Sequence, residues 1–190
     1  MALVDNPPAK VHIYLTGFMC SGKSTVGKIL ANAIGWNFTD LDAYIEEQEG
    51  ISVPEIFAQR GEEYFRKKEA DILTLLAGGE RQVISLGGGT IYYFANLEQI
   101  LQTGWLIYLN VPLPEIYRRL KFKTNRPLFQ TSASIVEKTE GMKKIQDLFD
   151  QRRPYYERAD LIIESHSKPV GVTIDEIVKR LKRLGIITYD

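Results

Sequence analysis

The stretch that decides the fold is Gly17-Phe18-Met19-Cys20-Ser21-Gly22-Lys23-Ser24-Thr25. It has the pattern G-x-x-x-x-G-K-[ST], in which loop amides surround phosphate oxygens at the start of a helix. A strand-like apolar run precedes it at Val11–Leu15, and a helix-like run follows at Thr25–Ile34. The order of strand, glycine loop and helix predicts a site for a nucleoside triphosphate rather than a chance glycine turn.

Three residues of this loop have separate tasks in the predicted site. Gly22 lets the backbone approach the phosphates, and Lys23 supplies a positive charge for the outer ones. The Ser24 hydroxyl stands where such loops hold Mg²⁺.

Apolar strand-like runs recur along the chain, with helical patterns between them. They lie at 83–86, 105–109 and 161–163, with a shorter run near Phe38. Strands that alternate with helices predict an α/β fold with a parallel sheet covered on both faces. Capping boxes at Ser52–Glu55 and Thr173–Glu176 predict two helix starts.

Composition narrows the class of protein. A chain of 190 residues is expected to form one domain, 1–190, and its zero net charge disfavours a nucleic-acid binder. The single cysteine excludes an internal disulfide and fits a reducing compartment. Since there is neither a membrane-length apolar run nor a signal-peptide pattern, we expect a cytoplasmic protein without membrane contact. We also expect a monomer.

Two acids after the run near Phe38 are the candidates for metal and proton chemistry. The strand-like run 82–86 ends in glycines and carries no acid, so the pair Asp40-Leu41-Asp42 is considered instead. In an extended segment Asp40 and Asp42 would share one face. One could then support Mg²⁺ through water while the other accepts or orients a hydroxyl proton. The alternative is that Asp42 caps a helix at Ala43–Gln48.

Three arginines suggest an acceptor that carries a carboxylate. Arg66, Arg126 and Arg152 follow the phosphate loop, and a guanidinium grips carboxylate or phosphate through two parallel hydrogen bonds. The alternatives are a helix-surface pair of Arg66 with Glu62 and a solvated charge run around Arg152. The non-periodic stretch 121–134, which contains Arg126, is either a lid or an ordinary solvated loop.

Other classes of phosphate-loop protein fit poorly. The chain has no guanine-reading N-K-x-D segment and no transporter signature L-S-G-G-Q. Its glycine run Gly87-Gly88-Gly89-Thr90 does not match the dinucleotide pattern G-x-G-x-x-G.

Together these segments resemble the shikimate kinase family from about Val11 to Asp160. The phosphate loop alone is generic, whereas the ordered set of further segments is specific. Those segments are Asp40-Leu41-Asp42, Pro54-Glu55-Ile56-Phe57, Phe65-Arg66-Lys67-Lys68-Glu69, Ile84-Ser85-Leu86-Gly87-Gly88-Gly89, Arg126-Pro127-Leu128 and Arg152-Arg153-Pro154-Tyr155-Tyr156.

The resemblance implies a fold and a reaction. The fold is a three-layer αβα arrangement like that of nucleoside monophosphate kinases, with a five-stranded parallel sheet and helices on both faces. A substrate-binding helical region is implied at about 40–70 and a lid at about 119–135. The implied reaction is ATP- and Mg²⁺-dependent transfer of the γ-phosphoryl group to the 3-hydroxyl of shikimate, giving shikimate 3-phosphate on the route to chorismate and the aromatic amino acids.

The resemblance also implies roles for individual residues. Those implied to bind ATP are Cys20, Ser21, Gly22, Lys23, Ser24, Thr25, Arg119 and Arg126, with Arg119 packing on adenine and Arg126 reaching from the lid. Ser24 and Asp40 are implied to hold Mg²⁺. Those implied to bind shikimate are Asp42, Phe57, Phe65, Arg66, Glu69, Gly87, Gly88, Gly89 and Arg152, with Glu69 orienting Arg66. The implied catalytic residues are Lys23, Asp42 and Arg126.

Two departures from the family pattern are visible. Family loops usually carry glycine where Cys20 stands, and the stretch between Arg126 and Arg152 is longer than usual. The alternatives at this point are a related small-molecule kinase such as a gluconate kinase, or a phosphate-loop protein that binds ATP without catalysis.

Overall fold

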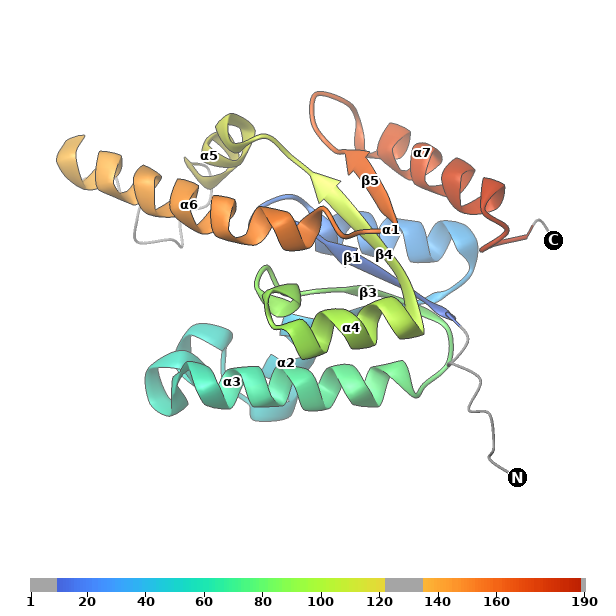
Figure 1. Cartoon of the computed structure of the whole chain (residues 1–190), viewed down its shortest axis with the longest axis horizontal. Coiled ribbons are helices and arrows are strands. Elements are labelled where there is room, and N and C mark those ends of the chain that lie inside the picture. Colours follow the sequence, from blue (N-terminus) through green and yellow to red (C-terminus); the bar gives the residue numbers. More distant parts are fainter. Residues whose placement is uncertain (1–9, 122–134, 189–190) are drawn as a thin grey trace.

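The structure, a computed structural model, describes residues 10–121 and 135–188. Its centre is one sheet of five parallel strands: β1 (His12–Thr16), β2 (Asn37–Asp40), β3 (Gln82–Ser85), β4 (Gly104–Asn110) and β5 (Leu161–Glu164). Their order across the sheet is β2-β3-β1-β4-β5 (Figure 1). The predicted α/β class and five-stranded parallel sheet are confirmed.

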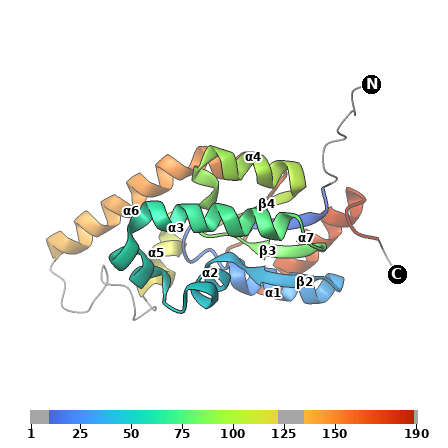
Figure 2. The ribbon, with the colours of Figure 1, turned by 90° about the horizontal axis from the view of Figure 1, so that it is seen from below.

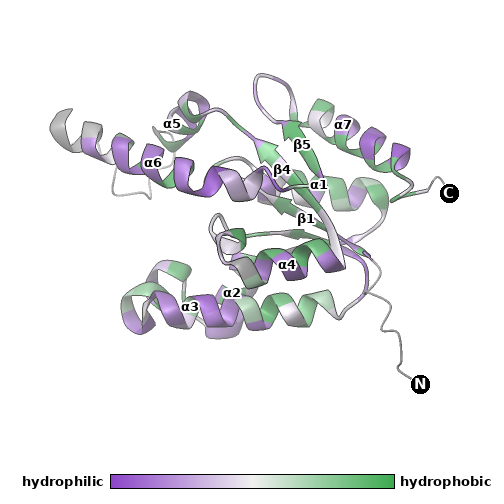
Figure 3. Cartoon of the chain, in the orientation of Figure 1, coloured by the Kyte–Doolittle hydropathy of each residue, from purple (hydrophilic) through white to green (hydrophobic). Residues whose placement is uncertain are grey.

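The strands are apolar because helices bury both faces of the sheet. In β1, Ile13 and Leu15 belong to one core cluster and Tyr14 to the other, which is the alternation expected of a strand. All five residues of β1 are buried. Figure 3 shows the same concentration of apolar residues along the strands.

The helices form a layer on each face of the sheet. α1 (Lys23–Ile34) and α7 (Val170–Arg183) pack against the face that carries Ile13 and Leu15. The opposite core cluster takes residues from the other helices, which are α2 (Leu41–Glu49), α3 (Val53–Ala77), α4 (Phe94–Thr103), α5 (Leu113–Lys121) and α6 (Ile135–Tyr156). Figure 2 shows α3 and α4 on the side of the sheet away from α1.

Two helix starts differ from the sequence-based expectation. α1 begins at Lys23, so the phosphate loop runs directly into it. α7 begins at Val170, three residues before the capping box predicted at Thr173. The carbonyl of Pro169 accepts hydrogen bonds from the amides of Val172 and Thr173, and Thr173 is buried inside the helix rather than capping it.

The long helix α3 is interrupted at one residue. Its first turn has the predicted capping box, because the Glu55 carboxylate accepts hydrogen bonds from the backbone and hydroxyl of Ser52. Gly61 has φ 81° and ψ 170°, a conformation that interrupts the helix and that glycine tolerates best. The break separates Phe57 from Phe65 and Arg66, which lie in the second part of α3.

Among the residues that the structure describes, no helix combines the length and the apolar character needed to cross a membrane.

Candidate active site

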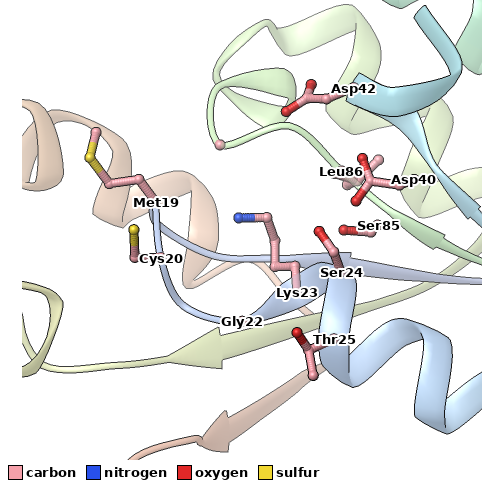
Figure 4. Close-up of a pocket in the computed structure, with 11 residues that line it drawn as sticks. Met19, Cys20, Gly22, Lys23, Ser24, Thr25, Asp40, Asp42, Ser85 and Leu86 are labelled. Carbon is pink, nitrogen blue, oxygen red and sulfur yellow. The ribbon is translucent and has the colours of Figure 1, made fainter. Parts of the chain in front are cut away.

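The residues of the phosphate loop line a cavity at the carboxyl ends of the strands. Its volume is about 260 Å³. The phosphate loop follows β1, Asp40 is the last residue of β2 and Ser85 is the last residue of β3. Three neighbouring strands thus place residues around the cavity. The cavity is lined by Met19, Cys20, Gly22, Lys23, Ser24, Thr25, Asp40, Asp42, Ser85, Leu86 and Gly88 (Figure 4).

The loop backbone is arranged for an anion. Gly22, the residue before α1, has φ 97°, a value that L side chains rarely adopt. No side chain caps α1, so its first amides are available to phosphate oxygens, which the positive end of the helix favours. The Lys23 ammonium donates to the carbonyls of Gly17 at 2.8 Å and Phe18 at 3.2 Å, and it points into the cavity.

Cys20 occupies the left-handed backbone region. Its φ is 59°, one of two positive values among the non-glycine residues described. This conformation explains why glycine suits the position, since a side chain there costs of order 1–2 kcal/mol. The loop therefore keeps a glycine-like conformation even though it carries a cysteine.

Asp40 and Asp42 line the same cavity, as expected, but they do not lie in the extended segment that was predicted to bring them together. β2 ends at Asp40 and α2 begins at Leu41, so Asp42 lies in the first helical turn rather than in an extended segment. The capping alternative for Asp42 is also wrong, because Asp40 is the capping residue and accepts a hydrogen bond from the Ala43 amide at 3.2 Å. Asp42 is thereby left to face the cavity.

The environment of Asp42 favours its protonated form. Burial, together with the nearby carboxylates of Glu69 and Asp40, raises the pKa of Asp42 to about 6, against the opposing effect of Lys23. A carboxyl group with a pKa near physiological pH suits proton transfer.

Arg66 is held by two carboxylates on its own helix. Its Nη1 donates to Glu69 at 2.9 Å, and its Nε and Nη2 donate to Glu62 at 3.2 Å. Glu69 is completely buried, and its second oxygen accepts a hydrogen bond from the Thr90 hydroxyl. The helix-surface pair with Glu62 therefore exists, but it accompanies a buried pair that fixes the guanidinium.

Arg152 reaches the glycine run from α6. Its Nη1 donates to the Gly88 carbonyl at 3.0 Å, and the Tyr156 hydroxyl donates to the same carbonyl at 2.6 Å. No carboxylate of the described residues forms an ion pair with Arg152, so its charge is available to an anion.

The glycine run lies between these charged groups. A Cβ atom on Gly89 would lie 3.0 Å from Arg66 Nη2 and 3.1 Å from Arg152 Nη2. A Cβ atom on Gly87 would lie 2.7 Å from Asp42 Oδ1 and 3.0 Å from Glu69 Oε1. Two guanidinium groups thus converge at Gly89, and the Asp42 carboxyl lies two residues away at Gly87.

Phe57 and Phe65 pack beside Arg66. Their ring centroids are 4.8 Å apart, and the Arg66 guanidinium carbon lies 5.8 Å from the centroid of Phe57 and 5.1 Å from that of Phe65. The structure thus places both predicted wall residues next to the predicted carboxylate ligand.

The remaining predicted ATP ligands have different outcomes. Arg119 donates from Nη1 to the carbonyls of Cys20 at 3.1 Å and Ser21 at 3.2 Å, so it holds the phosphate loop from α5. Arg126 and most of the predicted lid lie outside the described residues.

The donor set fits Mg²⁺. Hydroxyl and carboxylate oxygens of Ser24, Ser85 and Asp40 line the cavity together. Protein sites usually hold this ion with one or two carboxylates and substrate phosphates. In residues 10–121 and 135–188, no group of three or more His, Cys, Asp or Glu side chains could hold a metal unaided. The site therefore suits a metal that arrives with a phosphate chain.

Several residues at this site were missed from the sequence, and two of them show why. Ser85 could have been found as the last residue of a strand beside the phosphate-loop strand, since ligands bind at the carboxyl ends of such strands. Thr90 follows the glycine run, but its hydrogen bond to Glu69, 21 residues away, left no local signal.

Comparisons with known proteins agree with one another. The family model "Shikimate kinase" matches residues 19–182. A shikimate kinase of Chlorobium chlorochromatii is 41% identical over 172 residues, which are 90% of each chain.

Two solved structures are similar over nearly the whole fold. A shikimate kinase from Bacteroides thetaiotaomicron has a TM-score of 0.82 at 34% identity, covering 90% of this chain and 98% of the other. A shikimate kinase from Acinetobacter baumannii, solved in complex with shikimate, has a TM-score of 0.81 at 32% identity, covering 93% and 95%.

Proposed function

This chain belongs to the shikimate kinase family and phosphorylates shikimate with ATP in aromatic biosynthesis, and we propose that the groups around Gly87–Gly89 hold the acceptor for that reaction. The observation that carries this proposal is the convergence of Arg66 and Arg152 at Gly89, with the Asp42 carboxyl at Gly87. The product would be shikimate 3-phosphate.

Arg66 and Arg152 bind the acceptor's carboxylate. Each presents an Nη2 atom beside Gly89, and a carboxylate placed there can accept hydrogen bonds from both. Glu69 acts through Arg66, because its buried carboxylate fixes the guanidinium. Phe57 and Phe65 form the apolar wall of this subsite.

Asp42 receives or orients the proton of the acceptor's hydroxyl. It lies between the glycine run and the phosphate loop, since it approaches Gly87 and shares the cavity with Lys23 and Ser24. A ring whose carboxylate lies at Gly89 can present a hydroxyl to Asp42 on its far side. The raised pKa of Asp42, about 6, supports this role as a base.

The phosphate loop binds ATP through Cys20–Thr25. The first amides of α1 and the Lys23 ammonium would contact the phosphates, while Ser24 and Asp40 would hold Mg²⁺, Asp40 through water. Bound there, Mg²⁺ neutralises charge on the phosphates. Arg119 positions the loop and borders adenine, and Arg126 contacts the phosphates from the lid.

We also propose the organisation of the molecule. It acts as one domain, with its substrate-binding region at about 40–70 and its lid at about 119–135, and as a cytoplasmic monomer. Zero net charge supports the absence of nucleic-acid binding, and the single cysteine supports a reducing location.

The test is an assay of ADP release with shikimate, gluconate and the methyl ester of shikimate as acceptors. Shikimate should be preferred strongly, and the ester should lose most of that preference because it lacks the charge that the arginines bind. Arg66→Lys keeps the charge but loses one charged hydrogen bond of about 1.5–3 kcal/mol, so kcat/KM for shikimate should fall ten- to a hundredfold.

Arg153→Lys is the matched control. Arg153 follows Arg152 on α6 but pairs with the exposed Glu157, so its substitution should leave kcat/KM unchanged. Equal turnover of gluconate and shikimate, or an unchanged kcat/KM in Arg66→Lys, would refute the assignment of this subsite.

A further inference from the structure

The side chain of Tyr93, the residue just before α4, does not cap that helix. Tyr93 stands at the N-cap of α4, with φ −85° and ψ 116°, and no side chain caps this helix end. Ser, Thr, Asp and Asn are preferred at such positions because their side chains accept hydrogen bonds from the first amides. The N-terminus of α4 therefore has no side-chain cap, and the Tyr93 side chain extends to another part of the molecule.

That side chain reaches Arg66 on α3. The Arg66 guanidinium carbon lies 5.0 Å from the centroid of the Tyr93 ring, within the range of a cation–π contact. The Tyr93 hydroxyl also donates to Glu62 Oε1 at 3.3 Å, the same oxygen that accepts from Arg66 Nε and Nη2. Tyr93, Glu62 and Arg66 form a closed set of contacts.

Tyr93 contributes a ring from outside helix α3. Phe57, Phe65 and Tyr93 lie around one guanidinium, at 5.8, 5.1 and 5.0 Å, but the first two belong to α3, as Arg66 does. The ring of Tyr93 comes from the segment that directly follows the glycine run. It therefore ties the guanidinium to that segment, where the acceptor's carboxylate is proposed to bind.

The contact continues across the glycine run to α6. The ring of Tyr92 meets Tyr93 at 5.9 Å and Tyr155 at 5.2 Å, and Tyr155 lies three residues after Arg152 on the same helix. Figure 1 shows the start of α4 between α3 and α6. Aromatic contacts thus connect the segments that carry the two converging arginines.

We propose that Tyr93 is a positioning residue for the carboxylate subsite, because its ring holds the Arg66 guanidinium in the orientation that receives the acceptor. This inference rests on the proposed carboxylate role of Arg66. An arginine side chain has many rotamers, and ordering it during binding weakens affinity. A ring that orders Arg66 beforehand lowers KM for the acid acceptor and leaves ATP binding unaffected.

The test replaces the aromatic ring of Tyr93 with an apolar side chain that has no ring. Tyr93→Leu should raise KM for shikimate about three- to thirtyfold, the range that corresponds to loss of one cation–π contact, with kcat and KM for ATP unchanged. Tyr93→Phe keeps the ring and loses only the long hydrogen bond to Glu62, so its KM should stay within about twofold of the parent. Folding is checked by the melting temperature, and Tyr93→Met makes the same comparison if the leucine variant is unstable.

Two controls identify the cause. Tyr64→Leu removes a ring that makes the same kind of contact with a different arginine, Arg60, at 4.9 Å, and its KM should change by less than about twofold. The methyl ester of shikimate has no negative charge for Arg66 to bind, so Tyr93→Leu should barely alter its KM.

The outcomes separate this inference from the proposed function. If Arg66→Lys raises KM for shikimate and Tyr93→Leu does not, the role of Tyr93 is wrong and the carboxylate subsite stands. If Arg66→Lys has no effect, the subsite assignment itself fails. Equal losses in Tyr93→Phe and Tyr93→Leu, or equal losses for the acid and its ester, would also refute the positioning role.

Discussion

Asp42→Asn is expected to inactivate the enzyme and at the same time to stabilise its unliganded form. Asparagine cannot accept the hydroxyl proton, so kcat should fall. The stabilisation follows from the pKa of Asp42, which burial, together with Glu69 and Asp40, raises from 3.8 to about 6. A raised acid pKa means that the folded protein binds the proton more tightly than the unfolded chain does.

The size of the effect depends on pH in a defined window. Below about pH 3.8 Asp42 is protonated in both the folded and the unfolded protein, so it does not lower the free energy of unfolding. As pH rises to about 6, stability is lost, because the unfolded chain releases the proton first. Above that pH the full penalty is present, and two pH units at about 1.4 kcal/mol each give about 3 kcal/mol. This figure is an upper bound, since the N-terminus of α2 favours the ionised form.

Urea unfolding of the unliganded protein at two pH values measures this difference. Asp42→Asn should raise the free energy of unfolding by up to about 3 kcal/mol near pH 8 and by up to about 1 kcal/mol near pH 4.5. Asp40→Asn is the matched control: asparagine caps α2 equally well, and Asp40 acts on Asp42 less than burial and Glu69 do, so its gain should be smaller. A gain in Asp42→Asn that is absent, or that is the same at both pH values, would refute this reasoning.

Four further outcomes are expected. The kcat/KM of the parent enzyme for shikimate should fall as pH drops through about 6, since the base is lost on protonation; a flat profile down to about pH 5 would argue against Asp42 as the base. Lys23→Ala should abolish ADP release while the protein remains folded, and wild-type turnover would refute the phosphate-loop assignment. Asp40→Asn should need more Mg²⁺ for half-maximal activity, whereas a shift seen only in Asp42→Asn would exchange the two roles. A thiol alkylator should label Cys20, which lines the cavity with Lys23, and inactivate the enzyme unless MgATP is present; intact mass and residual activity measure this, with Cys20→Gly as the active, insensitive control.

The phosphate loop and the sheet could be predicted from the sequence because both depend on local patterns. Glycine spacing sets the loop backbone, and short apolar runs separated by helical ones specify buried parallel strands. The position of α7 could not be predicted in this way, because Thr173 carries the capping pattern but is buried within the helix that begins at Val170.

The structure brings many of the predicted site residues together, although their geometry was not predicted. Asp40 and Asp42 were placed together for a wrong reason, since a helix starts between them. The hydrogen bond of Glu69 with Thr90 and the ring contact of Tyr93 with Arg66 join residues more than 20 positions apart, and such contacts leave no periodic signal. They arise only when α3 packs beside the segment that follows β3.

The parallel sheet also determines how the protein can be attached to a support or to another enzyme. Lys10, the first residue described, precedes β1, and Thr188, the last, lies beside Trp36 and Arg81, which directly precede β2 and β3. Both described ends therefore lie at the amino ends of the strands, while the candidate site lies at their carboxyl ends. Immobilisation or fusion through either end should orient the catalytic cavity outward, so that substrates reach it without passing the attachment.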